Sequence, residues 1–250
     1  MMNYIYFSAS GTTKEIISVF SKAIGGEAKA YDLLRRQPEE QVNFKKDDAA
    51  VFAFPVFGGR LPGICPGMLR KFRGNNTPAA AIVVYGNRAY DDALLELSDI
   101  LREQGFVTVA AAAFIAQHSI FPAVASGRPD SEDRQKIISF ASSAKEKLAS
   151  AEPVLVKGNR PYIKAGRVSL HPSGDKKCDS CGACVKVCPV KAINADNPKK
   201  TDARKCIACT ACIAVCPRHS RAFHVPVVYP LVSKGFAKSN AERKEPEIFL

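Results

Sequence analysis

The sequence predicts an α/β domain built on a doubly wound parallel sheet, followed by a smaller α+β module that binds metal. Residues 1–150 alternate apolar runs with amphipathic segments, which is typical of a parallel sheet with helices on both faces. Eight of the nine cysteines then fall between positions 178 and 216. With 250 residues, 46% of them hydrophobic, the chain is long enough for two modest domains.

Five apolar runs in the first 150 residues are predicted strands, and the second of them is the weakest. Helix-length segments separate them, so we expect parallel strands joined by right-handed crossovers in a three-layer domain. In chain order the strands cover residues 3–8, 28–33, 49–56, 79–86 and 107–116.

Four segments near these strands are predicted helices. In the first, Ile16, Phe20 and Ile24 lie on one apolar stripe. The second is interrupted by Pro and Gly and is expected to be short, and the third ends on a glycine in the capping position. The last begins with an acidic cluster and ends near two lysines, charges that suit the helix dipole. In chain order the helices cover residues 12–24, 62–74, 91–105 and 130–150.

The composition of the sequence changes after residue 150. A stretch rich in Pro and Gly is interpreted as a connection, and the cysteine motifs follow it. The predicted division is an α/β domain at 1–150, a linker at 151–173, a cysteine module at 174–227 and a C-terminal tail at 228–250. The linker and the tail are each expected to be either a tether or packed structure.

The cysteines form a short internal repeat. Each half has the pattern C-x2-C-x2-C-x3-C-P, and the second half follows the first at a constant offset of 28 residues. Three cysteines at spacing three can converge on one cubic iron-sulfur cluster, while the fourth, which precedes a proline, points to the other cluster. A pseudo-twofold axis is therefore expected. The expected ligand sets are Cys178, Cys181, Cys184 and Cys216 for one 4Fe-4S cluster, and Cys206, Cys209, Cys212 and Cys188 for the other.

Zinc is the alternative metal for these cysteines. Structural zinc sites usually take pairs of ligands with a longer spacer between them, a pattern that four cysteines in eleven residues match poorly. Residues 170–225 instead resemble a bacterial-type two-cluster ferredoxin. That resemblance implies two clusters that accept and pass single electrons.

A second candidate site follows the first predicted strand. The sequence SASGTTKE, residues 8–15, joins that strand to a helix. Backbone N–H groups and the helix dipole favour a phosphate there, and the hydroxyl side chains can add donors. The alternative is that Ser and Thr only cap the helix.

Two further loops are expected at the same edge of the sheet. PVFGGRLP (55–62) and YGNRAYDDA (85–93) follow the third and fourth predicted strands. With these loops, residues 1–150 resemble a flavodoxin domain, which implies a five-stranded sheet of order 2-1-3-4-5 and bound FMN. On this resemblance, Ser8, Ser10, Gly11, Thr12 and Thr13 hold the phosphate, Pro55, Phe57 and Gly58 line one side of the flavin, and Gly86, Asn87 and Tyr90 line the other, with Tyr90 as the stacking residue.

The whole chain resembles the flavodoxin-ferredoxin fusion proteins of anaerobic bacteria and archaea. The resemblance implies an electron-transfer protein in which FMN couples two one-electron clusters to two-electron carriers. One alternative is an enzyme, a flavin-dependent reductase of a small molecule in which Arg60 or His118 assists. Another is a redox or oxygen sensor whose clusters control binding to a partner protein.

Charge and composition narrow the partners. Residues 1–150 hold 18 Lys and Arg against 16 Asp and Glu, whereas residues 151–250 hold 18 against 8. Two clusters, each of about −2, offset only part of that excess, so an acidic redox partner protein is expected. No basic motif favours nucleic acid, and no apolar run reaches the roughly 18 residues of a membrane helix. We therefore expect a cytoplasmic protein. The ninth cysteine, Cys65, is expected to be a small buried apolar residue.

Overall fold

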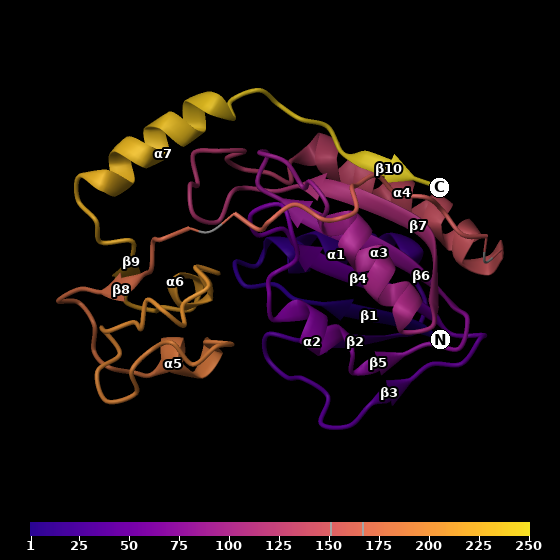
Figure 1. The fold of residues 1–250 in the computed structure, drawn as a ribbon, viewed down its shortest axis with the longest axis horizontal. Coiled ribbons are helices and arrows are strands. Elements are labelled where there is room, and N and C mark those ends of the chain that lie inside the picture. Colours follow the sequence, from indigo (N-terminus) through magenta and orange to yellow (C-terminus); the bar gives the residue numbers. More distant parts are fainter. Residues whose placement is uncertain (151, 167) are drawn as a thin grey trace.

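Six strands form the central sheet of the larger lobe in the computed structural model, which describes residues 1–150, 152–166 and 168–250 (Figure 1). The five predicted strands are all present and parallel, in the predicted order 2-1-3-4-5. They are β1 (Met2–Tyr6), β2 (Ala28–Asp32), β4 (Ala49–Pro55), β6 (Thr77–Tyr85) and β7 (Phe106–Ile115). The sheet has one strand more than predicted, because β10 (Glu247–Phe249) pairs antiparallel with β7.

Burial along the strands follows their position in the sheet. Every residue of β6 is buried, because β6 is a central strand with helices over both faces. The weakly predicted β2 is an edge strand that exposes three of its five residues. Two short strands that the sequence did not predict, β3 (Val42–Asn43) and β5 (Phe72–Arg73), form a separate parallel pair.

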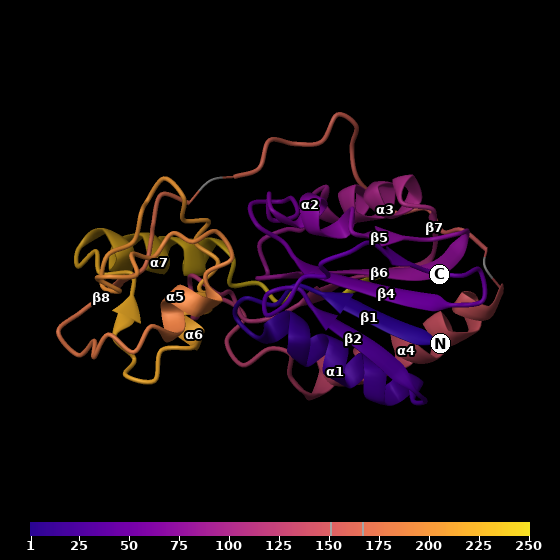
Figure 2. The same cartoon turned by 90° about the horizontal axis from the view of Figure 1, so that it is seen from below.

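The four predicted helices cover the two faces of the sheet (Figure 2). The helices α1 (Thr12–Ile24) and α4 (Ser131–Ser150) pack together on one face, and α2 (Cys65–Leu69) and α3 (Ala93–Glu103) cover the other. Phe20 and Phe140 lie in the first core, and Phe52 and Leu97 in the second. None of the described helices is long and apolar enough to cross a membrane.

The smaller lobe repeats its backbone as well as its cysteines. Its elements are β8 (Ser173–Gly174), α5 (Ala183–Val187), α6 (Ala211–Ala214) and β9 (Arg221–Ala222), and α5 and α6 begin 28 residues apart. Positive φ angles also recur at this offset: 61° at Ser180 and 52° at Ala208, and 74° at Gly182 and 65° at Thr210. The internal duplication in the sequence is therefore a duplication of the fold.

The segment after α4 is packed structure. The backbone N–H of Val154 donates to the carbonyl of Thr108, and both Asn159 and Ile163 donate their backbone N–H to the Asp92 carboxylate. Arg160 donates two hydrogen bonds to Asp99, at 2.9 and 2.6 Å. The exact domain boundaries stay a prediction, but residues 152–166 are fastened to the larger lobe.

The tail also has structure that the sequence did not indicate. It forms the helix α7 (Val228–Ser239) and then returns to the larger lobe, where it ends as β10 (Figure 1). Tyr229 and Phe236 of α7 pack with Phe121, which follows β7, and with Phe223 of the smaller lobe. The smaller lobe is thus attached to the larger one by both of its ends.

Candidate functional site

A cavity of about 410 Å³ lies at the carboxyl edge of the parallel sheet. We call it the edge cavity. Its walls come from the segments after four parallel strands and from one residue of the smaller lobe, Cys209. The lining residues are Ala9, Ser10, Thr12, Pro55, Phe57, Val84, Tyr85, Gly86, Ala116, Gln117, His118, Ser119 and Cys209.

The loop before α1 contributes Ser10 and Thr12 to the edge cavity, and their hydroxyl groups are 3.1 Å apart. Gly11 precedes α1 with φ at 98°, a left-handed conformation that favours glycine. Within the described part of the chain, no acceptor pairs with the backbone N–H groups of residues 10–13. Ser8 has a different role, because its Oγ accepts the Lys14 N–H at 2.9 Å. The capping interpretation is therefore right for Ser8, while the donors of residues 10–13 remain available.

The loop after β4 divides its residues between two roles. Pro55 and Phe57 line the edge cavity, but Gly58 does not. Gly58, with φ at 58°, lies against Gly166, whose N–H donates to its carbonyl at 2.9 Å. A Cβ on Gly58 would come within 2.2 Å of the Gly166 carbonyl oxygen. Gly58 therefore packs closely against the connecting segment, and its role beside a flavin stays a prediction.

The loop after β6 places its three predicted flavin residues in different surroundings. Gly86 lines the edge cavity, whereas Asn87 and Tyr90 do not. The Tyr90 ring is buried, 5.6 Å from the Tyr85 ring, and burial, with a further contribution from Glu247, raises its pKa. The stacking role of Tyr90 stays a prediction.

Asn87 holds the C-terminal tail. Its Nδ2 donates to the carbonyls of Asn240 and Glu242, at 2.9 and 2.7 Å, and its Oδ1 accepts the Lys244 N–H at 3.2 Å. The side chain is 2% exposed. An ion pair between Arg243 and Asp130 fastens the same stretch of the tail.

His118 lines the cavity as a neutral donor. Its Nδ1 accepts the backbone N–H groups of Ile120 and Phe121, at 3.2 and 3.1 Å, so the proton of the neutral ring is on Nε2. Burial, with a smaller contribution from the charge of Arg88, lowers its pKa to about 4. The neighbouring Gln117 and Ser119 also line the cavity and were not predicted. The signal that could have found them is their position directly after the fifth parallel strand, at the ligand-binding edge.

One set of four cysteines surrounds a hollow of about 330 Å³ in the smaller lobe. We call this the proximal hollow, because Cys209 lines both it and the edge cavity. Its cysteines are Cys188, Cys206, Cys209 and Cys212. Backbone N–H groups approach two of the sulfurs: that of Ala192 lies 3.2 Å from the Cys188 Sγ, and that of Ala208 lies 3.4 Å from the Cys206 Sγ.

The other set of four cysteines surrounds a second hollow of about 290 Å³, which we call the distal hollow. Its cysteines are Cys178, Cys181, Cys184 and Cys216. Cys181 is exposed, so this hollow lies near the surface. The N–H of Ser220 reaches the Cys216 Sγ at 3.3 Å. The structure therefore brings each predicted ligand set together, and four thiols with N–H groups aimed at sulfur fit a 4Fe-4S cluster.

Cluster binding must remove protons from these thiols. Burial raises the pKa of Cys209 to about 12, so the free thiol is protonated at neutral pH. Since thiolate is the form that ligates iron, assembly of a cluster in the proximal hollow is coupled to proton release.

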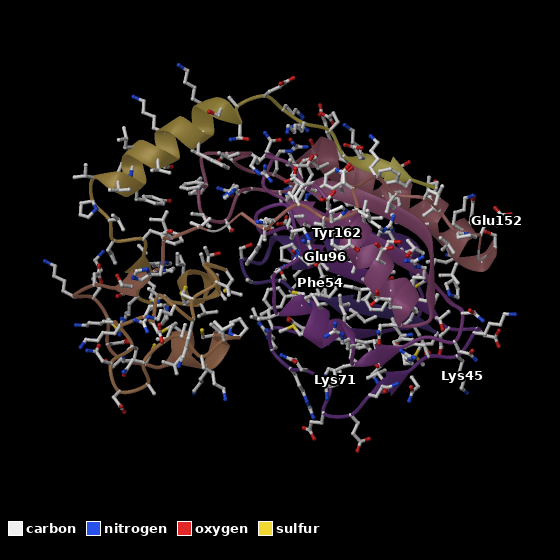
Figure 3. All side chains as sticks on the ribbon, in the orientation of Figure 1. Lys45, Phe54, Lys71, Glu96, Glu152 and Tyr162 are labelled. Atoms are coloured by element: carbon white, nitrogen blue, oxygen red, sulfur yellow. The ribbon has the colours of Figure 1, made fainter. Side chains whose placement is uncertain are left out.

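Two residues considered from the sequence lie outside the cavity and the hollows. Arg60 donates two hydrogen bonds of 2.8 Å to Glu96 and lies 4.4 Å above the Tyr162 ring, so it clamps the connecting segment and is not free to assist a substrate. Figure 3 labels its two partners, Glu96 and Tyr162. Cys65 is the first residue of α2 and is fully buried in the core, and burial raises the pKa of its thiol. The expectation of a buried apolar role for Cys65 agrees with this position.

Residues 173–217 match the family described as the 4Fe-4S dicluster domain. The smaller lobe is a 4Fe-4S dicluster domain. The match contains all eight clustered cysteines, and the larger lobe has the strand order of the flavodoxin fold. The chain therefore joins a domain with a flavodoxin-like fold to an iron-sulfur domain, as the sequence predicts.

Solved structures are similar to the larger lobe in fold alone. Flavodoxin 2 from Bacillus cereus is 16% identical, with 58% of this chain and 98% of that chain covered and a TM-score of 0.46. Rubredoxin oxygen:oxidoreductase from Desulfovibrio gigas is 14% identical, with 60% and 36% covered and a TM-score of 0.44. This chain thus matches about a third of the length of the second protein. No curated protein matches the sequence.

Proposed function

We propose that this protein is an electron carrier that holds two 4Fe-4S clusters and FMN in one line and exchanges electrons with an acidic redox partner. Cys209 carries the proposal, because one residue lines both the proximal hollow and the edge cavity. The clusters would supply one-electron chemistry, and FMN would connect it to two-electron carriers. The chain itself would position the clusters and FMN and shield them from solvent.

The edge cavity has the features that FMN requires. The free N–H groups at the start of α1, beside the hydroxyls of Ser10 and Thr12, suit a phosphate. Phe57 and Gly86 provide apolar and close-approach surfaces for a ring. His118 adds a neutral N–H donor, which can hydrogen-bond a ring nitrogen or oxygen without adding a charge.

The distal hollow is the proposed entry point for electrons. Cys181 is exposed, and the exposed Lys176 and Lys177 immediately precede Cys178. Positive charge around an exposed redox centre attracts an acidic partner over long range and orients it on approach. The rate of reduction by an acidic ferredoxin-type donor is therefore expected to fall steeply as ionic strength rises.

The first test is composition: about eight irons, eight sulfides and one FMN per chain are expected in protein purified without oxygen. The second uses equivalent cysteines of the repeat. Cys184→Ala removes a distal ligand and Cys212→Ala a proximal one, and each should lose about half of the iron. Cys212→Ala should abolish FMN reduction by a ferredoxin-type donor, and Cys184→Ala should slow it. Cys65→Ala is the control and should keep all of its iron. FMN reduction that is unchanged in both cluster variants would refute the proposal.

A flavin-dependent reductase is the second candidate, and His118 favours it. A neutral Nε2–H donor beside Gln117 and Ser119 is suitable for binding a small polar acceptor. Steady reduction of one organic acceptor, faster than with free FMN and lost in His118→Phe, would support this candidate. Equal rates of acceptor reduction in the original protein and in His118→Phe would exclude the reductase.

A further inference from the structure

The smaller lobe contains a buried arginine beside one of its two sets of cysteines. Arg221 is 3% exposed and lies in β9, five residues after Cys216. Its guanidinium donates to the carbonyls of Pro198 and Pro172, the latter at 2.6 Å, and to the Thr201 hydroxyl. All three partners are neutral. Among the ion pairs of the described residues, none involves Arg221, so its charge is buried without a carboxylate.

Arg221 lines the distal hollow together with Cys184 and Cys216. The Nε atom of Arg221 is buried and has no hydrogen-bond partner among the described residues. One fixed positive charge is thus buried beside the sulfurs of the distal cysteine set.

The internal repeat shows that this arginine is not required by the fold. At the offset of 28 residues, Arg221 corresponds to Ile193. Ile193 is also buried, at 7% exposed, and packs between Cys184 and Cys212. The same backbone position therefore accepts an apolar side chain in one half and holds a cation in the other. Burying an unpaired charge costs free energy, so a role in the chemistry of the lobe accounts for it better than packing does.

We propose that Arg221 is a buried electrostatic determinant that raises the reduction potential of the 4Fe-4S cluster in the distal hollow. The inference rests on the assembly of a cluster in that hollow. Reduction adds one electron to a cluster and forms or breaks no bond in the chain, so the charge beside the guanidinium becomes more negative. A nearby cation in a medium of low dielectric constant favours the state with more negative charge. Arginine keeps its charge at any pH that the fold tolerates, so its effect is permanent.

The test is a titration of the clusters with dithionite as the electron donor, followed by EPR, in three variants. Arg221→Ile copies the residue of the first repeat and removes the charge. At a fixed solution potential, we expect its ratio of reduced to oxidised cluster to fall at least tenfold for the distal cluster, which corresponds to about 59 mV per tenfold for one electron. Arg221→Lys keeps the charge, so its distal potential should shift less than that of Arg221→Ile.

Lys186→Ala is the matched control, because Lys186 is an exposed cation in α5, two residues from both Cys184 and Cys188. Its effect should be smaller and should vanish as salt is added, because water and ions screen an exposed charge. The effect of Arg221→Ile should persist in salt.

Iron and sulfide are measured in every variant, so failed cluster assembly is distinguished from a failed inference. Fully loaded Arg221→Ile with an unchanged distal potential would overturn the proposal. If that variant loses iron, Arg221→Gln is compared with Arg221→Lys. A larger shift with Gln than with Lys supports the role of charge, whereas equal shifts, or loss of iron in both, assign Arg221 a structural role only.

Discussion

The contact between Asn87 and the tail predicts how firmly β10 is held on the sheet. In Asn87→Gly, three hydrogen bonds of 2.7 to 3.2 Å disappear from a buried site. Glycine accepts the φ of 62° at this position, so the loss is confined to the side chain. At about 1 kcal/mol for each bond, the free energy of opening the tail should fall by about 3 kcal/mol, which is about two powers of ten in the opening equilibrium.

Native-state hydrogen exchange of the β10 amides measures this opening directly. We expect their protection to fall about a hundredfold, while amides in the central strand β6 keep theirs. Asn76→Gly is the matched control, because Asn76 also has a positive φ, of 51°, but its side chain is exposed and no hydrogen bond of the described residues joins it to the tail. Unchanged β10 protection in Asn87→Gly, or an equal loss in Asn76→Gly, would show that Asn87 does not hold the tail.

Three further outcomes follow from the cavity and the connecting segment. In Gly86→Ala, the new Cβ would lie 2.5 Å from His118 Cδ2, so FMN affinity should fall at least tenfold in a fluorescence titration, on the scale of a strained cavity wall; Gly63→Ala, which meets open space, should bind normally. The His118 ring should stay neutral in NMR spectra down to pH 5, because burial lowers its pKa to about 4. The contribution of the neutral ring to stability is then complete above pH 6.5 and is lost as pH falls. Titration of the ring near pH 6.5 would contradict its buried position. Burial opposes the charge of Asp92, but hydrogen bonds from Ile163 and the segment beside it lower the pKa below 3.8. The Ile163 amide signal should therefore titrate below pH 3.8, with the stabilisation complete above that value and lost as pH falls through the folded-state pKa.

Periodicity and spacing predicted the scaffold because both are local properties of the chain. Alternating apolar runs record which segments are buried, and five such runs with crossovers lead to few possible sheets. The spacing of the cysteines is fixed along the covalent chain. The eight clustered cysteines could therefore be assigned to two sets, one of which contains Cys178, before any contact was known. Ser10 and Thr12 were found for the same reason, since a loop between the first strand and its helix must lie at the carboxyl edge.

Contacts between distant residues could not be predicted in this way. Tyr90 and Asn87 are in the expected loop, yet Asn87 holds a tail more than 150 residues later, and Glu247 of that tail contributes to the raised pKa of Tyr90. Arg60 looked available because nothing in its own segment requires a cation, and its partner Glu96 lies 36 residues further along.

The sequence by itself determined the two folds, the eight cysteines and their grouping, because these depend on burial patterns and on fixed spacing along the chain. Only the tertiary structure decided that Cys209 joins the proximal hollow to the edge cavity, that the tail returns to the sheet, and that Arg221 is buried beside the distal cysteine set. Each of these depends on how two separately folded modules pack, and that packing is set by polar and apolar contacts between residues far apart in the chain.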